Sequence, residues 1–318
     1  MGYRNIESTP MLREGASQWK VFANFLRRPS FVYPAKPLPS VVQDLQVYEG
    51  EKPRLTWFGH SSYLVQCRGF NLLVDPVFCG YASPVPGMIK AFPGTNQYGA
   101  EQMPPIDLML LTHDHYDHLD RYAQKQMKAK TKFYICPAGV GRHLQEWGIT
   151  KEKIKELSWG DEMVLSPEIR IRSFTARHFS GRGLNRNATL WSSYLLDFYG
   201  FRIYIGGDSG YGSHFKDIGK EAGKIDLAIL ECGQYNQDWP YIHMLPEEVL
   251  KAVLDLHATH LLPVHWAKFG LAYHPWDEPI RRLLAAARNP DLVITTPRIG
   301  EPVVLGEHYP QDQWWENL

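Results

Sequence analysis

The stretch HDHYDH, residues 113–118, decides how the rest of this 318-residue chain is interpreted. It directly follows DLMLLT at 107–112, an apolar run that is typical of a buried strand. The motif therefore lies on a loop that leaves a rigid strand, where a preorganised site is expected. Imidazole nitrogen and carboxylate oxygen are ligand types of zinc, iron and manganese. The stretch predicts ligands for two ions: His113 and His115 for one, Asp117 and His118 for the other.

Further ligands are needed, because two ions with an open position for water or substrate require more than four protein groups. Three candidates each follow a strand-like run: His178 after IRSFTAR, Asp208 after RIYIGG and His265 after HLLPV. A His or Asp at the end of a strand, repeated three times, indicates one site gathered at one edge of the sheets.

Composition excludes several classes of function. Lys plus Arg and Asp plus Glu each number 34, so the formal charge is zero and a nucleic-acid partner is not expected. No apolar run approaches the roughly 18 residues of a membrane span, and the first fifteen residues do not resemble a secretory signal. The four cysteines are scattered, without a CxxC pair, which suits a cytoplasmic protein.

The remaining sequence reads as strands interleaved with helices. The predicted strands lie at 54–59, 62–67, 70–76, 107–112, 132–136, 168–174, 192–198, 201–207, 226–231, 260–265, 292–296 and 302–305. Helices are expected over 121–128, 139–147, 246–257 and 277–288. So many strands favour two packed sheets with helices outside them. Residues 1–50 differ in texture and are interpreted as an N-terminal extension packing on or near the core of a main domain, 51–318.

The order of these features resembles the metallo-β-lactamase fold superfamily. The landmarks are Asp75 in LLVDP, the HxHxDH loop at 113–118, and then His178, Asp208 and His265. The likeness spans about residues 54–270. It implies an α/β (α+β) fold, a four-layer αββα sandwich, with 51–318 as a metallo-β-lactamase fold hydrolase domain.

The resemblance also implies a division of labour among the ligands. Carried over by position, the first ion is held by His113, His115 and His178, the second by Asp117, His118 and His265, and Asp208 bridges them. Asp75 would stand behind the ligands and orient one of them. The implied cofactors are two divalent metal ions, zinc in first place with manganese or iron as alternatives.

The short sequences around the expected ligands point to one group within the superfamily. ARHFSGR around His178, GGDSGYGSHF around Asp208, HMLPEE at 243–248 and PVHWAKF around His265 look like the N-acyl-phosphatidylethanolamine-hydrolysing phospholipase D group and its bacterial relatives. That implies a phosphodiesterase acting on a lipid or lipid-like diester through a metal-bridging hydroxide. Two alternatives stay open: a lactone or amide hydrolase on a small, phosphorylated or unphosphorylated metabolite, and a non-catalytic metal-bound protein.

Substrate-side residues are expected around the ligands. Asp208 and His243 are the catalytic candidates, with His243 contacting phosphate or protonating the leaving side. Candidates for the substrate pocket are His214, Tyr211, Trp239, Trp266 and His274. His60, near the first hairpin, is expected to be structural or to stand behind a ligand. Trp19 lies in an apolar-basic stretch for which packing on the core is favoured over contact with a membrane surface. The oligomeric state stays open.

Overall fold

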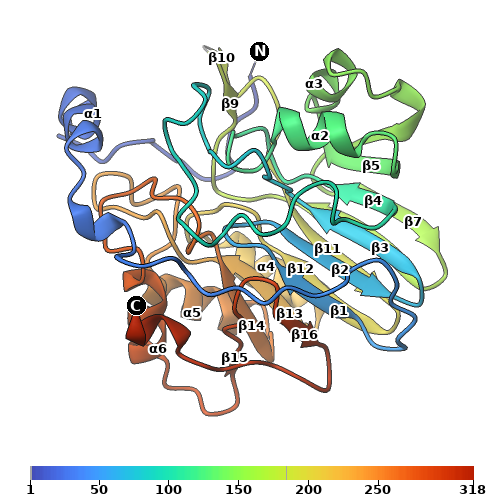
Figure 1. Ribbon diagram of the computed structural model, residues 1–318. Helices are drawn as coiled ribbons and strands as arrows, with labels where there is room; N and C mark the ends of the chain where they lie inside the picture. The colour runs from blue at the N-terminus through green and yellow to red at the C-terminus, as the bar shows by residue number, and fades with distance from the viewer. Residues whose placement is uncertain (1, 184) are drawn as a thin grey trace.

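Two mixed sheets of seven strands pack face to face, and helices cover their outer surfaces (Figure 1). The computed structural model describes residues 2–183 and 185–318, without the side chains of Phe22 and Leu26. The four-layer αββα arrangement expected from the sequence is confirmed.

The strands of the first sheet are, in spatial order, β16 (Pro302–Val304), β1 (Arg54–Trp57), β2 (Tyr63–Cys67), β3 (Phe70–Val74), β4 (Ile106–Leu110), β5 (Thr131–Pro137) and β6 (Ile154–Leu157). Those of the second sheet are β15 (Val293–Ile294), β14 (His260–Val264), β13 (Leu227–Glu231), β12 (Phe201–Ile205), β11 (Ser193–Phe198), β8 (Ile169–Phe174) and β7 (Glu162–Ser166). A separate ribbon pairs β9 (Gly181–Arg182) with β10 (Asn185–Arg186).

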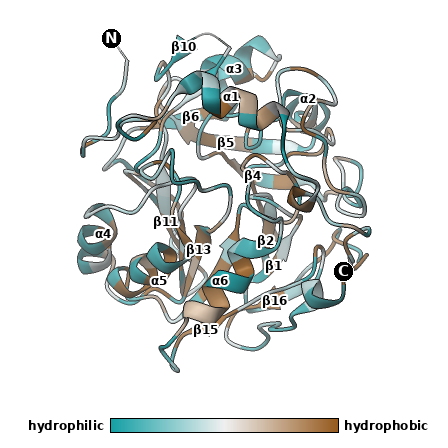
Figure 2. Ribbon diagram, turned by 90° about the vertical axis from the view of Figure 1, so that its left-hand side faces the viewer, coloured by the Kyte–Doolittle hydropathy of each residue, from teal (hydrophilic) through white to brown (hydrophobic). Residues whose placement is uncertain are grey.

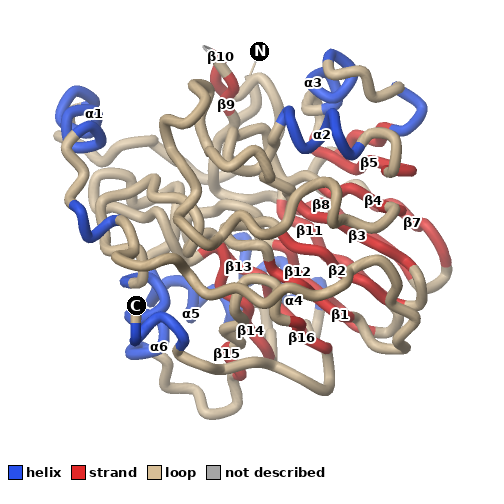
Figure 3. Tube along the Cα trace, viewed as in Figure 1, coloured by secondary structure: helices blue, strands red, loops and turns tan. Residues whose placement is uncertain are grey.

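The helices form the outer layers. The α-helices are α1 (Gln18–Leu26), α2 (Arg121–Met127), α3 (Gly141–Glu146), α4 (His214–Ala222), α5 (Pro246–Asp255) and α6 (Glu278–Ala286). Short 3₁₀ turns are η1 (Ser30–Val32), η2 (Lys151–Lys153) and η3 (Trp314–Asn317). Asp120 caps α2 by accepting the backbone N–H of Tyr122. Figure 3 shows the long loops gathered at one end of the two sheets.

The core follows from the alternation of side chains along each strand. On β4, Leu108 and Leu110 face the second sheet, whereas Met109 packs with Ala123 and Met127 of α2 on the opposite face. The second sheet is covered by α4, α5 and α6, whose apolar residues belong to the same continuous hydrophobic cluster as the inter-sheet core. Figure 2 shows hydrophobic colouring on β5 and β13 and mostly hydrophilic colouring on α4. Strands buried on both faces read as continuous apolar runs, which is why they were recognisable in the sequence.

All twelve predicted strands are present, and the sequence interpretation missed four others, β6, β7, β9 and β10. β6 and β7 are the outermost strands of their sheets, and each contributes half-buried or exposed charged residues. Edge strands commonly carry such charges, which obscure the apolar pattern. Helix α4 was also missed, since Gly219 lowers its intrinsic propensity. Gly219 is needed there, because a Cβ would lie 2.0 Å from the carbonyl oxygen of Asp255.

Residues 2–53, which precede β1, pass along the outside of the two sheets and contact the long loops at one end of them. Tyr273 donates its hydroxyl to the carbonyl of Val21 in α1, and Ser40 forms an isolated bridge with Ile299. Trp19 is 82% exposed, so this side chain takes no part in packing on the core, and packing of the stretch as a whole stays a prediction. Within the described residues, every helix falls short of the length and apolar character needed to cross a membrane. The domain boundary at residue 50 stays a prediction.

Candidate metal centre

The carboxyl ends of strands from both sheets meet at one end of the molecule. In the first sheet, β1 has the same direction as the parallel pair β3 and β4, because antiparallel β2 separates them. In the second sheet, β12, β13 and β14 are parallel, and β8 has their direction across antiparallel β11. The polar residues that follow or end these strands are His60, Asp75, the 113–118 loop, His178, Asp208, Glu231 and His265.

Four of these side chains form a first buried group: His113, His115, His178 and Asp208. Nδ1 of His115 lies 3.0 Å from Nε2 of His113 and 3.3 Å from Nε2 of His178. The carboxylate of Asp208 lies 3.8 Å from Nε2 of His113 and 3.7 Å from Nε2 of His178. Three imidazoles and one carboxylate therefore turn their ligand atoms toward one point.

A second group lies on the other side of Asp208 and contains Asp117, His118 and His265. Nε2 of His118 is 3.2 Å from Oδ1 of Asp208, and Nε2 of His265 is 3.2 Å from Oδ2. Oδ2 of Asp117 is 3.6 Å from Nε2 of His118 and 3.3 Å from Nε2 of His265. The structure thus brings together all seven ligands expected from the sequence, with Asp208 between the two groups.

These two groups fit a pair of divalent cations. Nε2 of His118 and Oδ1 of Asp208 are buried without a hydrogen-bond partner among the described residues, although they face each other. Buried polar atoms are nearly always satisfied. Imidazole and carboxylate groups converging in this way are satisfied by a cation. The buried clusters are consistent with a binuclear metal site.

The pKa values indicate which of the histidines are protonated when no cation is bound. Burial lowers the pKa of His113 and His178 well below the usual value, so both imidazoles are neutral. At His118 burial acts in the same direction, but the carboxylates of Asp208 and Asp117 outweigh it and raise the pKa well above its usual value. The same competition, with burial opposing and Asp208 prevailing, raises the pKa of His265 to about 10. A bound cation therefore displaces protons from His118 and His265.

Asp75, itself hydrogen-bonded to Thr112, fixes the ring of His118 in the second group from the side away from the metal position. Oδ2 of Asp75 accepts Nδ1–H of His118 at 2.8 Å and the hydroxyl of Thr112 at 2.5 Å. Oδ1 accepts the backbone N–H of Thr112 at 2.9 Å. A hydrogen bond at Nδ1 leaves Nε2 of His118 as the ligand atom. The structure thus places Asp75 where the resemblance implied, behind a ligand.

Gly207 allows the two sheets to approach each other at the site. It directly precedes Asp208, has a φ of +60°, and a Cβ there would lie 3.1 Å from both the Ser192 carbonyl oxygen and the Thr112 Cβ. Because Thr112 directly precedes His113, this glycine sits where the ligand loops of the two sheets touch. A side chain at residue 207 would push Asp208 away from the motif loop.

His243 lies beside the metal groups, within reach of Asp208 and His265. Its Nδ1 lies 3.3 Å from Oε2 of Glu231, a fully buried carboxylate at the end of β13. The other carboxylate oxygen of Glu231 accepts the backbone N–H of Met244 at 2.6 Å. Glu231 was missed in the sequence, although it ends an apolar strand as Asp75 and Asp208 follow theirs.

His60 is the other residue whose contact with the site was not foreseen in detail. Its Nε2 lies 2.9 Å from Oδ2 of Asp117, and its ring centroid is 4.1 Å from that of His265. Burial, followed by the neighbouring His265, lowers the pKa of His60 to about 3, so the ring is neutral. A neutral His60 can donate Nε2–H to Asp117 and hold that carboxylate toward the second group.

A cavity of about 220 Å³ opens onto the metal groups. Its apolar walls are Phe179, Trp239, Ile242 and Leu271, and His243 lies among its polar lining residues. Trp239 is thus the one aromatic candidate that the structure places at this cavity. The cavity offers a reacting molecule an apolar wall on one side and the ligand atoms on the other.

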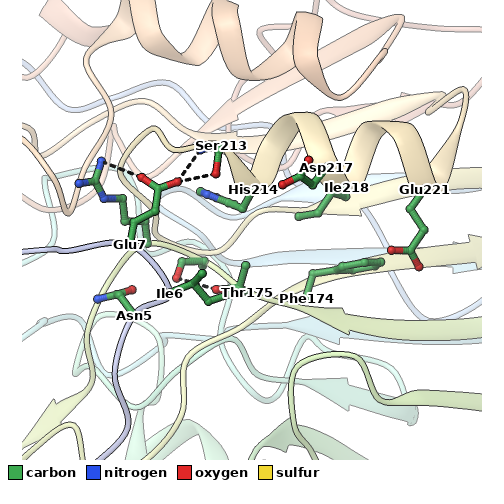
Figure 4. A pocket seen from close by; sticks show the side chains of 12 residues that line it. Asn5, Ile6, Glu7, Phe174, Thr175, Ser213, His214, Asp217, Ile218 and Glu221 are labelled. Carbon is green, nitrogen blue, oxygen red and sulfur yellow. Dashed lines mark hydrogen bonds and ion pairs between the residues drawn. The ribbon is translucent and has the colours of Figure 1, made fainter.

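Four pocket candidates lie elsewhere. Trp266 is buried between Trp57 and Trp314, and Tyr211 donates its hydroxyl to Asp255. His274 accepts the backbone N–H of Gln234 in a neighbouring groove. His214 lines a separate pocket between residues 5–7 and α4 (Figure 4). Closeness in sequence to a ligand did not determine side-chain direction for these four.

Known proteins resemble this chain along most of its length. A family model described as "Beta-lactamase superfamily domain" matches residues 71–266. An uncharacterized protein of Mycobacterium tuberculosis is 39% identical over 305 residues, covering 93% of this chain and 80% of the relative.

Two further relatives carry descriptive names. A Saccharomyces cerevisiae protein, named N-acyl-phosphatidylethanolamine-hydrolyzing phospholipase D, mitochondrial, is 32% identical over 261 residues, 77% of this chain. The match spans about half of that protein, 54% of its length. A protein of Nitratidesulfovibrio vulgaris named UPF0173 metal-dependent hydrolase is 30% identical over 220 residues, covering 68% of this chain and 81% of the relative.

Proposed function

The chain belongs to the metallo-β-lactamase superfamily and is a metal-dependent hydrolase, and on that basis we propose that it is a phosphodiesterase of the phospholipase D type. The proposed substrate is a lipid or lipid-like phosphodiester. The observation that carries the proposal is His243, which is held by Glu231 beside both metal groups without belonging to the seven expected ligands. The similarity to the yeast protein named as a phospholipase D supports the same choice.

The protein's own residues divide the work of hydrolysis. Two divalent cations, with zinc as our first choice, would be held by the seven expected ligands and would supply an activated water and neutralise charge on the phosphoryl oxygens. Asp208 faces both groups and fixes the spacing between them. As water oxygen bonds to phosphorus, the bond from phosphorus to the leaving oxygen breaks. The imidazolium form of His243 holds Glu231 through Nδ1–H and donates its Nε2 proton to that oxygen, and the proton that the attacking water loses restores the imidazolium.

A second candidate is supported by the size of the cavity. About 220 Å³ is below the roughly 300–1,000 Å³ of pockets that enclose drug-sized ligands. That volume suits a small metabolite with a lactone or amide bond. The apolar walls at Trp239 and Leu271 favour the lipid-like diester, of which only the reacting end would enter the cavity.

We further propose that the protein works in the cytoplasm, with peripheral contact to a membrane. The four cysteines are free, which suits a reducing compartment. Trp19 is exposed on α1, next to Lys20, and an aromatic ring beside a cation suits a lipid headgroup region.

The test is product formation by mass spectrometry, with metal-loaded and chelated protein. The substrate panel holds N-acylated phosphatidylethanolamine, simple phosphodiesters, sugar-phosphate lactones and acyl-homoserine lactones. Chelator-sensitive release of phosphatidic acid or a phosphomonoester is expected. Lactone opening without cleavage of any diester would instead establish the second candidate.

A pair of variants links the product to the site. His243→Gln should lower kcat by roughly 10²-fold, the lower end of what general acid catalysis contributes, with both metals retained. His308→Gln is the matched control and should leave kcat unchanged, because His308 is exposed and does not belong to the metal site. Equal rates in the two variants would remove His243 from the mechanism.

A further inference from the structure

A segment near the N-terminus, residues 4–9, lies against the loops that carry two of the metal ligands, His178 and Asp208. Asn5, Glu7 and Thr9 are half-buried, whereas Arg4 before them and Ile6 and Ser8 between them are exposed. This alternation is that of an extended segment with one face on the protein. Figure 4 shows the Glu7 carboxylate turned toward Ser213 at the start of α4.

Asn5 makes two hydrogen bonds to the backbone of the metal ligand His178. Its Nδ2 donates to the His178 carbonyl oxygen at 2.6 Å, and its Oδ1 accepts the His178 N–H at 3.1 Å. Oδ1 also accepts Nε1–H of the buried Trp191 at 3.2 Å. One side-chain amide therefore satisfies both polar backbone groups of a residue 173 positions away, as a neighbouring strand would.

The rest of the segment fixes the loop after β12, which carries Asp208. Glu7 accepts the backbone N–H and the hydroxyl of Ser213, both at 2.7 Å. Arg177 donates to Thr9 and to the Ser8 carbonyl, and also to the carbonyl of Tyr211. This arginine directly precedes His178, so it links the segment to both ligand loops.

We propose that residues 5–9 form an N-terminal strap and that Asn5 is a positioning residue for His178. The ring of His178 is held at Nδ1 by the Ile242 carbonyl at 2.8 Å, and Asn5 holds its backbone. Together these contacts aim Nε2 at His115 and Asp208. The proposal rests on the metal site of the proposed function and not on its substrate, since the strap acts on the affinity for the ion in the first group.

The experiment measures Zn²⁺ affinity by competition with a chromophoric chelator, for the full chain and its variants. Asn5→Ala is expected to weaken one of the two bound equivalents by roughly tenfold, as loss of a group supporting a ligand does, and to leave the other within twofold. Asn5→Asp keeps the acceptor for the His178 N–H and should fall between Ala and the unaltered protein. Asn71→Ala is the matched control, because the Asn71 amide likewise donates to a backbone carbonyl, that of Pro105, and accepts from Gln66, but contacts no metal ligand and lies outside the strap.

The outcomes separate the strap from a general effect on stability. An equal loss of both equivalents in Asn5→Ala, or no loss in either, overturns the proposal. Circular dichroism of the metal-free variants reports folding, and if Asn5→Ala does not fold, Asn5→Asp decides between the same outcomes. Metal affinities that change as expected, with every substrate of the panel left uncleaved, would leave the strap standing and reject the proposed function.

Discussion

Asp75→Asn is the sharpest test of how the second metal group is held. The substitution keeps size and shape, and the backbone is not at issue, because residue 75 has a φ of +39° that Asn tolerates well. The wild-type carboxylate accepts three hydrogen bonds: two from Thr112 and one from His118. An amide oxygen can replace one carboxylate oxygen only, since the amide nitrogen is a donor.

The direction of the new amide follows from the backbone. The Thr112 N–H, 2.9 Å from Oδ1, cannot turn away, so the amide oxygen must remain there. The amide nitrogen then faces Nδ1 of His118, which must become an acceptor. Its proton moves to Nε2, the atom that should hold the ion. Metal affinity is expected to fall by roughly 10–100-fold, which corresponds to about 1.4–2.7 kcal/mol.

The assay is Zn²⁺ competition with a chelator, together with urea unfolding of the metal-free protein. Asp120→Asn is the control: this buried carboxylate also accepts three N–H groups, from Phe78, Cys79 and Tyr122, and contacts no ligand ring. Both variants should lose about 1–3 kcal/mol of unfolding free energy, and Asp75→Asn alone should lose metal affinity. Zn²⁺ bound by Asp75→Asn within twofold of wild type would refute the reasoning.

Three further predictions concern the site and its surroundings. Chelation should lower the unfolding free energy, and each tenfold rise in free Zn²⁺ above its Kd should restore about 1.4 kcal/mol per bound ion; a midpoint independent of Zn²⁺ would contradict a native metal site. Glu231→Gln should reduce kcat by roughly tenfold with both metals retained, because one amide cannot accept from both His243 and Met244, and metal analysis beside the kinetics checks it. Burial lowers the pKa of Lys268 from 10.5 to about 8, so the unfolded chain binds more protons between these values and stability rises with pH there. From pH 8 to pH 9 wild type should therefore gain about 1 kcal/mol relative to Lys268→Met. A difference in unfolding free energy that does not change with pH would show that the pKa of Lys268 is not lowered in the folded protein.

Sequence reasoning reached the ligands because strand ends are visible in a sequence and meet at one edge in the fold. His178, Asp208 and His265 each follow an apolar run, and the runs prove to be strands of one direction. Glu231 obeys the same rule and was not assigned to the site, whereas His60 was expected to be structural or to stand behind a ligand. A carboxylate that ends the buried run DLAILE could have been recognised as Asp75 was.

The substrate pocket was harder to predict, because neighbours in sequence point in different directions. Trp266 directly follows His265, yet its ring turns into the core against Trp57. Tyr211 lies three residues after Asp208 and reaches Asp255 of α5 instead. Side-chain direction in a loop depends on backbone angles such as the φ of +68° at His265, which composition and spacing do not reveal. The strap could not be predicted from the sequence either, because Asn5 and His178 are 173 residues apart and no sequence pattern connects them.

Because strand ends from both sheets meet at the site, metal affinity depends on the correct register of those strands. A strand that slips by one residue turns its side chains to the opposite face and carries the residue at its end out of place. Such an error in β4, β12 or β14 would remove a ligand from the site, even where the apolar core tolerated it. The ions then bind tightly only to a chain whose strands are all in register and whose two sheets are correctly seated. Metal binding therefore stabilises the correctly paired sheets relative to compact states in which a strand is out of register.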